Sequence, residues 1–371
     1  TGDTATTIST IGSTAFGIGS AALFWRERTR RSNQLNRMER ELNAESLEVR
    51  IPVNTAISSA RPSARLKDLK SKRRILAIRG SGEQLSVPVW NMLCILRRRL
   101  VQSQTLVVLV PTDGSQKEDW GWDAKQMNNA MWLAEPLNVD GQDGWINYFQ
   151  ELLDNGDGSS SDSNDKLAWF ALNFKGRSIA SGLDEPPRVL ELLGQQLQPM
   201  DLLDNTDEDE LREDVPAVKQ ILECQKKFYN VLTDSSDEND MQPIFTDSSA
   251  EEVNEVVNGG GRIDGWDKCL EPGARPSGMV ISGSDVWVTS NTLAYSTCIE
   301  FPSNAGIDGA TLLAVQRWGR ETGDGDWKLE LHQTIPWSAG SRAGGTLRCD
   351  CRGCVALARA QEKRTFGGLI G

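Results

Sequence analysis

Histidine is almost missing from this sequence, which has one, His332, among 371 residues. A Ser-His-Asp hydrolase, a metal site made of several histidines and a histidine acid–base pair would each have to use this single residue. Hydrophobic residues make up 38% of the chain and charged residues 25%, a balance typical of globular proteins. The length is enough for two ordinary domains. We therefore expect a folded chain of two domains with little scope for histidine chemistry.

Positive charge is scarce except in one segment. The net charge is −12, yet residues 26–100 hold 18 Lys and Arg against 7 Asp and Glu, a balance of +11. This basic segment directly follows an uncharged stretch, an order that favours contact with an anionic lipid bilayer. Because the rest of the chain is acidic, we expect no nucleic-acid partner.

Charged residues are absent from residues 4–25, a run that would span about 33 Å as a helix, enough to cross a bilayer core. Its small residues recur at spacings of three and four, which lets another helix approach closely: Gly12, Ala15, Gly19 and Ala22. Trp25 falls where an aromatic belt would lie, and it precedes a basic group formed by Arg26, Arg28, Arg30 and Arg31. The pattern predicts a transmembrane helix over 1–25 and a basic stalk helix over 26–50. A targeting sequence or a buried helix are the alternatives.

The next segment, 51–200, alternates strand and helix signals. Buried strands are expected over 74–79 and 105–111 with a helix over 87–101 between them, which makes a parallel βαβ unit. A hairpin over 167–182 and a closing helix over 187–197 follow. This order resembles the thioredoxin and peroxiredoxin fold. The resemblance implies a reactive cysteine in the loop 79–86, but that loop has none, and Cys94 lies within an apolar helix where we expect it to be buried.

Four tryptophans occupy the long insertion of this domain: Trp120, Trp122, Trp132 and Trp145. Tryptophan is enriched at interface hot spots, so these residues could form a docking surface. They could equally fill the domain's own core. The sequence alone does not separate the two interpretations.

An acidic linker over 201–214 precedes a second domain over 215–345, in which helices come before several antiparallel strands. The segments CLEPGARPSG, GATLLAVQRW and WKLELHQTIPW resemble the NTF2-like superfamily and its SnoaL-like branch. The resemblance implies a cone-shaped fold with an internal pocket, for which Trp266 and His332 are the candidate lining residues. Acid–base chemistry on a small apolar ligand would need His332, Asp267 or Glu300 inside that pocket.

Cysteine is sparse, and the odd number of seven favours reduced thiols over a disulfide framework. The tail over 346–371 nevertheless contains a C-x-C-x-x-C motif, formed by Cys349, Cys351 and Cys354. Three thiolates at this spacing could bind zinc, although no fourth ligand stands at a motif spacing. Redox-sensitive thiols, including a regulatory disulfide, and purely structural cysteines are the alternatives.

The segments FGIGSAALFWRERTRR, LNRMERELNAESLEVR and LKDLKSKRRILAIRG are similar to chloroplast proteins of the low photosystem II accumulation family. The resemblance implies a single-pass protein of the plastid thylakoid with stromal domains, assisting photosystem assembly. It implies photosystem core or antenna proteins as partners, and it allows chlorophyll or carotenoid at the membrane helix. The tetratricopeptide repeats of that family are missing here.

The expected fold is therefore an α+β multidomain protein with an N-terminal transmembrane helix, a thioredoxin-like α/β domain and an NTF2-like α+β cone. The expected function is a thylakoid-anchored, non-catalytic scaffold, either an assembly factor or a linker subunit of a photosystem–antenna complex. The alternative is a pocket protein that binds or isomerises a small apolar ligand.

Overall fold

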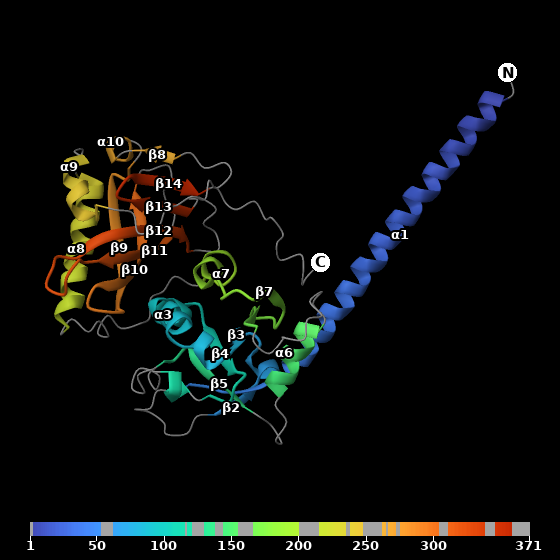
Figure 1. Ribbon diagram of the computed structural model, residues 1–371, viewed down its shortest axis with the longest axis horizontal. Coiled ribbons are helices and arrows are strands. Elements are labelled where there is room, and N and C mark those ends of the chain that lie inside the picture. The colour runs from blue at the N-terminus through green and yellow to red at the C-terminus, as the bar shows by residue number, and fades with distance from the viewer. Residues whose placement is uncertain are drawn as a thin grey trace.

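The computed structural model describes residues 3–52, 62–115, 117–120, 130–137, 144–154, 166–199, 215–234, 238–247, 262–264, 266–271, 275–303, 311–337 and 346–357. These residues form one long N-terminal helix and two seven-stranded sheets (Figure 1). The mixed helix and strand content agrees with the expected α+β chain.

Helix α1 (Asp3–Glu45) is continuous over 43 residues and projects far from the two sheets (Figure 1). It joins the predicted membrane segment and the predicted stalk into one element. No helix in the described part of the chain is both long enough and apolar enough to cross a membrane. The uncharged run is rich in Ser, Thr and Gly, so it is not hydrophobic enough for a membrane span although it carries no charge. The predicted transmembrane helix over 1–25 is therefore wrong, and so is the predicted single-pass thylakoid location with stromal domains.

The first sheet has the strand order β2-β1-β5-β4-β3-β6-β7. Its centre is the parallel pair β3 (Arg74–Gly80) and β4 (Thr105–Pro111), which confirms the predicted βαβ unit. The remaining strands are β1 (Glu48–Arg50), β2 (Ser63–Arg65), β5 (Leu133–Leu137), β6 (Ala168–Leu172) and β7 (Ser178–Leu183). β6 and β7 form the predicted antiparallel hairpin. Both central strands are buried along nearly their whole length, as expected of a sheet covered on two faces.

Helices cover both faces of this sheet. One face packs against α6 (Gly144–Asp154) and the C-terminal end of α1, and the core there is rich in aromatic residues of α6. The other face packs against α3 (Val87–Ile95), α4 (Arg97–Gln102) and α7 (Val189–Gln195). The single helix predicted over 87–101 breaks at Leu96, which has the non-helical angles φ −103° and ψ 9°. The short elements are η1 (Leu66–Leu69), α2 (Gly82–Leu85) and η2 (Lys117–Trp120).

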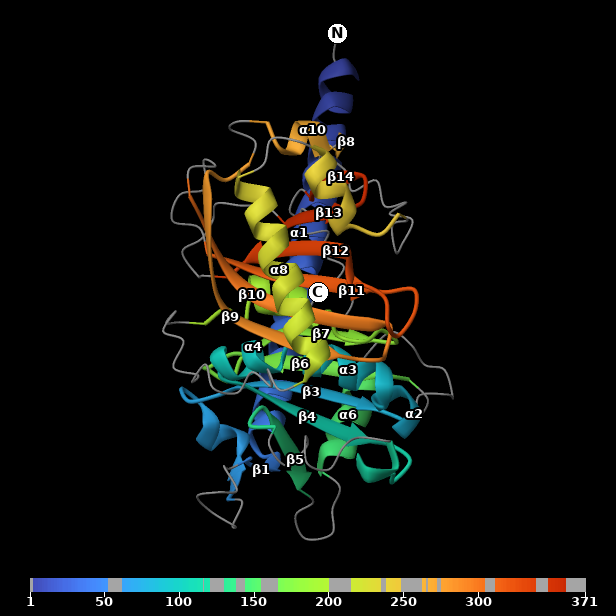
Figure 2. The same cartoon turned by 90° about the vertical axis from the view of Figure 1, so that its left-hand side faces the viewer.

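The second sheet has the order β8-β14-β13-β12-β11-β10-β9, and every neighbouring pair is antiparallel. The strands are β8 (Arg262–Asp264), β9 (Gly278–Val288), β10 (Leu293–Ser303), β11 (Leu312–Gly319), β12 (Lys328–Pro336), β13 (Thr346–Asp350) and β14 (Gly353–Leu357). Helix α8 (Pro216–Asp234) lies across one face of this sheet (Figure 2). Short elements α9 (Glu238–Met241), η5 (Gln242–Ile244) and α10 (Trp266–Cys269) complete that layer. Part of the predicted cysteine-rich tail thus belongs to the sheet, as β13 and β14. A helix expected near 250–257 lies outside the described residues.

The two sheets are joined through a shared core. The face of the second sheet that α8 leaves open packs on α3 and α7, so Ile299, Leu313 and Ile335 belong to the same buried cluster as Leu93 and Val189. Three arginines of α4 also reach β9 across the junction. Arg97 pairs with Asp285, Arg98 donates to the Ser284 carbonyl, and Arg99 donates to the Gly283 carbonyl. The two sheets are therefore packed as one body.

Candidate functional site

Polar side chains gather in the space between α8 and the second sheet. Strand residues alternate between faces, so the face opposite the shared core receives Cys298 and Glu300 from β10, Gln316 from β11 and His332 from β12. All four are buried to at least 98%. Helix α8 adds Tyr229 and Gln225 to the same layer. Buried polar groups are costly unless they are hydrogen-bonded, so their partners decide what the cluster does.

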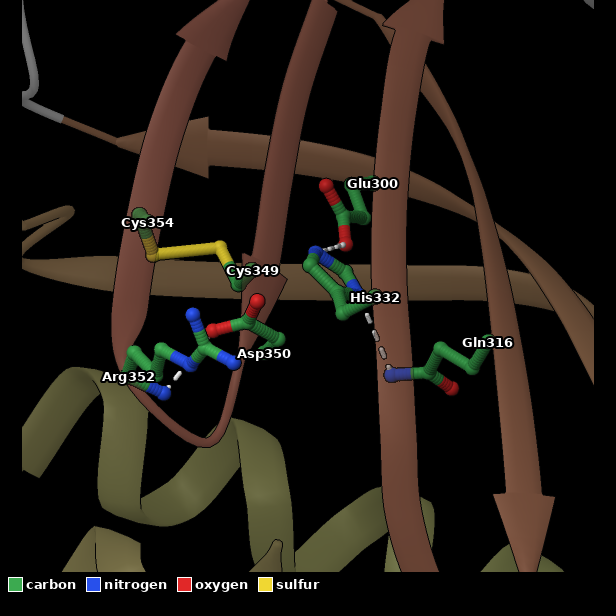
Figure 3. The surroundings of a disulfide bond; sticks show 7 residues. All are labelled: Glu300, Gln316, His332, Cys349, Asp350, Arg352 and Cys354. Carbon is green, nitrogen blue, oxygen red and sulfur yellow. Dashed lines mark hydrogen bonds and ion pairs between the residues drawn. A yellow bond between two sulfur atoms is a disulfide. The ribbon is translucent and has the colours of Figure 1, made fainter. Parts of the chain in front are cut away.

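Glu300, Tyr229 and His332 form the acidic end of this cluster. The Tyr229 hydroxyl donates to Glu300 Oε1 at 2.6 Å and lies 3.1 Å from Cys298 Sγ. His332 Nε2 lies 3.5 Å from the same carboxyl oxygen, and Figure 3 shows the two side chains facing each other. On its other side, His332 Nδ1 lies 3.3 Å from Gln316 Nε2. Because the amide nitrogen can only donate, Nδ1 accepts and the imidazole N–H is assigned to Nε2, toward Glu300.

The amide end of the cluster is built from Gln225, Gln316 and Ser296. Gln225 Nε2 donates to Gln316 Oε1 at 2.8 Å and to Ser296 Oγ at 3.1 Å. Ser296 Oγ also donates to Gln316 Oε1 and accepts from Trp318 Nε1, both at 2.8 Å. Ser284 Oγ donates to Gln225 Oε1 at 3.0 Å. The network is therefore connected from α8 through three strands, an arrangement that fixes the register of the helix on the sheet.

Burial sets the charge state of the acidic end. Burial raises the pKa of Glu300 to about 7, against a lowering effect of the hydrogen bond from Tyr229. Burial lowers the pKa of His332 to about 3. Their spacing is that of an ion pair, but desolvation favours the neutral form of each group. We conclude that the pair is neutral around pH 5 and that Glu300 begins to ionise near neutral pH.

Aromatic rings fill the space between the two candidate pocket residues. Trp266 stacks on Phe245 with ring centroids 4.9 Å apart, Phe245 lies 6.2 Å from Phe228, and Phe228 lies 4.9 Å from His332. Trp266 and His332 thus both face the interior, but packed rings separate them. A surface hollow of about 280 Å³ lies in the other half of the molecule, beside Leu47 and Trp145.

The cysteine motif lies beside this interior. Cys349 on β13 and Cys354 on β14 are joined by a disulfide (Figure 3). Cys351, in the turn between them, is half-buried and forms no disulfide. Two of the three predicted thiolate ligands are therefore consumed in a covalent bond. Among the described residues, no group of three or more His, Cys, Asp or Glu side chains is placed to hold a metal ion. The structure corresponds to the disulfide alternative rather than to zinc.

The other predicted site residues lie apart from this cluster. Trp120, Trp132 and Trp145 are buried in the core of the first half, so they pack the core instead of forming a docking surface. Trp122 and the side chains of Gly12, Ala15, Gly19 and Ala22 lie outside what the structure describes. Cys94 is buried, as expected, and burial raises the pKa of its thiol. Trp25 is exposed on α1, and so is the basic group Arg26, Arg28, Arg30 and Arg31.

Tyr229, Gln225 and Gln316 were missed by the sequence analysis. A signal for Gln225 existed, because it interrupts the apolar face formed by Val218, Ile221 and Phe228 of the predicted helix. A polar residue in the middle of an apolar helix face indicates a buried hydrogen-bonding partner. No comparable signal marks Tyr229, because a tyrosine on the apolar face of a helix is also common as an ordinary core residue.

No protein-family model matches the sequence, and no curated protein matches it.

Proposed function

We propose that this protein is a non-catalytic scaffold that binds an amphipathic helix of a partner protein on the exposed apolar face of α1. The single observation that carries the proposal is the line of large apolar side chains on this helix. Leu35, Met38 and Leu42 are 65%, 58% and 63% exposed. Their spacings of three and four residues place them on one face of the helix. Exposed apolar groups arranged in this way are typical of a helix-binding seam.

Other side chains of α1 fix its C-terminal half to the body. Arg37 donates to the Ser178 carbonyl at 2.7 Å, and Glu41 accepts from the Ser178 amide at 3.0 Å. Ala44 is fully buried, and Glu45 pairs with Lys70. The apolar face is thus presented by a helix held at its C-terminal end, which reduces the entropy lost when a partner binds.

Charge favours a partner with an acidic segment. The turns before the apolar face carry Arg26, Arg28, Arg30 and Arg31, all exposed, against the single Glu27. Arg28 and Arg31 continue the same helix face at the same spacing. A second copy in parallel register would bring each of these arginines against its counterpart, which costs free energy. An acidic amphipathic helix would pair with them instead, and the resemblance to photosystem assembly proteins makes photosystem core and antenna subunits the first partners to test.

The test is the binding of a designed peptide helix with a Leu stripe and Glu flanks, measured by fluorescence anisotropy. The triple variant Leu35→Ser/Met38→Ser/Leu42→Ser should weaken binding by at least about tenfold, since apolar burial is lost. The variant Thr29→Ser/Asn36→Ser, at exposed positions off the apolar stripe, should bind like the unchanged protein. Equal binding by both variants would contradict the proposal. Concentration-dependent dimerisation through these residues, or binding to phosphatidylglycerol vesicles without binding of the peptide, would contradict it as well.

A second candidate is a ligand-binding or isomerase function of the cone. It is favoured by Glu300, whose pKa of about 7 suits a general acid or base, and by the Trp266 indole N–H, a buried donor without a partner among the described residues. Against it, Phe228 and Phe245 occupy the interior between Trp266 and His332. A shift in melting temperature on addition of small apolar ketones, lost in Glu300→Gln, would favour this candidate. If none of these ketones shifted the melting temperature, the scaffold function would remain as the proposal.

A further inference from the structure

We propose that the Cys349–Cys354 disulfide is redox-active, and that a dithiol protein of the thioredoxin class reduces it and thereby releases β14, β8 and α10 from the end of the second sheet. All seven cysteines are in the described part of the chain, and the other five form no disulfide. A single disulfide among five thiols does not resemble the framework of a secreted protein, in which cysteines pair throughout. It is typical instead of a cysteine pair whose state changes.

The disulfide adds little to the stability of the fold as a whole, because it closes only a short loop. Cys349 and Cys354 are directly opposite each other in the β13–β14 register and only five residues apart in sequence. Closing so short a loop restricts the unfolded chain far less than closing a long one. Reduction therefore costs the whole fold little, and its effect is expected to be confined to the end of the sheet formed by β14, β8 and α10.

The position of the disulfide couples it to the buried cluster. Cys349 is the direct register partner of His332, and cross-strand partners point to the same face of a sheet, so the sulfur lies on the side of the interior (Figure 3). Beyond it, β8 pairs only with β14 among the described strands, through three register pairs. Helix α10 packs on both β14 and β8, and its Trp266 begins the ring stack that ends at His332. Loosening β14 would therefore loosen helix α10 and the position of its Trp266.

Four of the chain's other five thiols, those of Cys94, Cys224, Cys298 and Cys351, have a raised pKa and are therefore poor nucleophiles toward this bond. Burial raises the pKa of Cys94 and raises that of Cys298 to about 12, so both stay protonated. The pKa of Cys351, the third cysteine of the hairpin, is raised mainly by burial and also by the negative charge of Asp350. An outside dithiol must therefore supply the electrons.

The exchange balances in two steps. A thiolate of the reductant attacks Cys354 Sγ, forms a mixed disulfide and releases the Cys349 thiolate, which takes up a proton. The second thiol of the reductant loses its proton and attacks the sulfur of the reductant's first cysteine in the mixed disulfide. This releases the Cys354 thiolate, which is protonated in turn. Two electrons pass from the reductant, which becomes a disulfide, to the hairpin, which becomes a dithiol. Because Cys349 and Cys354 are both buried, attack requires opening of the hairpin edge.

The experiment treats the full chain with pre-reduced thioredoxin under native conditions, without a small-molecule thiol. Maleimide mass tagging after denaturation should count five thiols before treatment and seven after it. Hydrogen exchange should rise in residues 262–271 and 346–357 and stay unchanged in β6 and β7. Cys351→Ser is the matched control from the same hairpin, and it should keep both responses with one tag fewer throughout.

Cys349→Ser should show fast exchange in those residues with or without thioredoxin. If that variant does not fold, the thiol count of the unchanged protein still decides. A count that stays at five until the protein is unfolded would overturn the proposal. So would a count of seven with no change in exchange at β8 and α10, or loss of the response in Cys351→Ser.

Discussion

At the scale of single residues, Glu300 is a carboxyl group that the fold protects from ionising. Its pKa is raised by burial to about 7, while the ordinary value is 4.5. A group whose folded pKa is raised binds its proton more tightly in the folded state. Glu300 therefore stabilises the fold at low pH, and this contribution is lost as the pH rises from about 4.5 to about 7. His332, with a lowered pKa, acts in the opposite sense between about 3 and 6.5.

The substitution Glu300→Gln should remove the first of these effects. The amide oxygen can still accept from Tyr229, so the hydrogen bond survives. Relative to the unchanged protein, the variant should gain on the order of 3 kcal/mol of unfolding free energy as the pH rises from 4.5 to 7. Urea unfolding at several pH values measures this, with Glu321→Gln on an exposed turn as the control. A difference independent of pH would show that Glu300 titrates normally.

Gly194 is a second informative residue, because it lets α7 approach β12. A Cβ placed there would lie 2.7 Å from Ile335 Cδ1 and 3.2 Å from Ile335 Cβ. Gly194→Ala should lower the unfolding free energy by about 1–2 kcal/mol, although alanine ordinarily favours helices. Gly323→Ala, at an open position, should change it little. Stabilisation by Gly194→Ala would mean that α7 and β12 are not in close contact.

At the scale of elements, α1 carries the proposed function, and its exposed arginines lead to a separate prediction about the charge of the partner. Reversing Arg28 and Arg31 to Glu should weaken binding of the Glu-flanked peptide and strengthen binding of the same peptide with Lys flanks. About tenfold in each direction is expected for two exposed contacts, and less at high salt, which screens them. Anisotropy titrations at low and high salt measure both arms. Equal weakening of the two peptides would indicate damage to the helix instead of a change in charge pairing.

The sequence predicted the positions of helices and strands better than the breaks between them. The apolar runs of β3 and β4 and the alternating residues of β12 were recognisable because each strand's period is local. The break at Leu96 was not, because no glycine or proline marks it in the sequence. The membrane span failed for another reason: a run without charge was taken as apolar, while Ser, Thr and Gly dominate it.

The candidate site was predictable only in part. His332, Glu300 and Trp266 were candidates for the cone interior because of the resemblance, while strand alternation left open whether His332 faces the interior or solvent. Tyr229 and Gln225 come from a helix whose register on the sheet is a tertiary property, invisible to local patterns. The pairing of Cys349 with Cys354 depends on the hairpin register, which the motif spacing alone left open.

At the scale of the molecule, the two sheets share one buried cluster and a set of arginine contacts from α4. They should therefore unfold together. Calorimetry of the full chain should give a single transition whose calorimetric and van't Hoff enthalpies agree. Two resolved transitions would show that the two halves are independent and only tethered.

The central claim is that a partner helix lies on the apolar face of α1, and site-specific photocrosslinking tests it most directly. A benzophenone amino acid in place of Met38, on the face, or of Asn36, off it, is irradiated with the Glu-flanked peptide bound. The account predicts crosslinks from position 38 to the apolar stripe of the peptide and few from position 36. Equal crosslinking from both positions, or crosslinks from 38 only to a second copy of the chain, would contradict it.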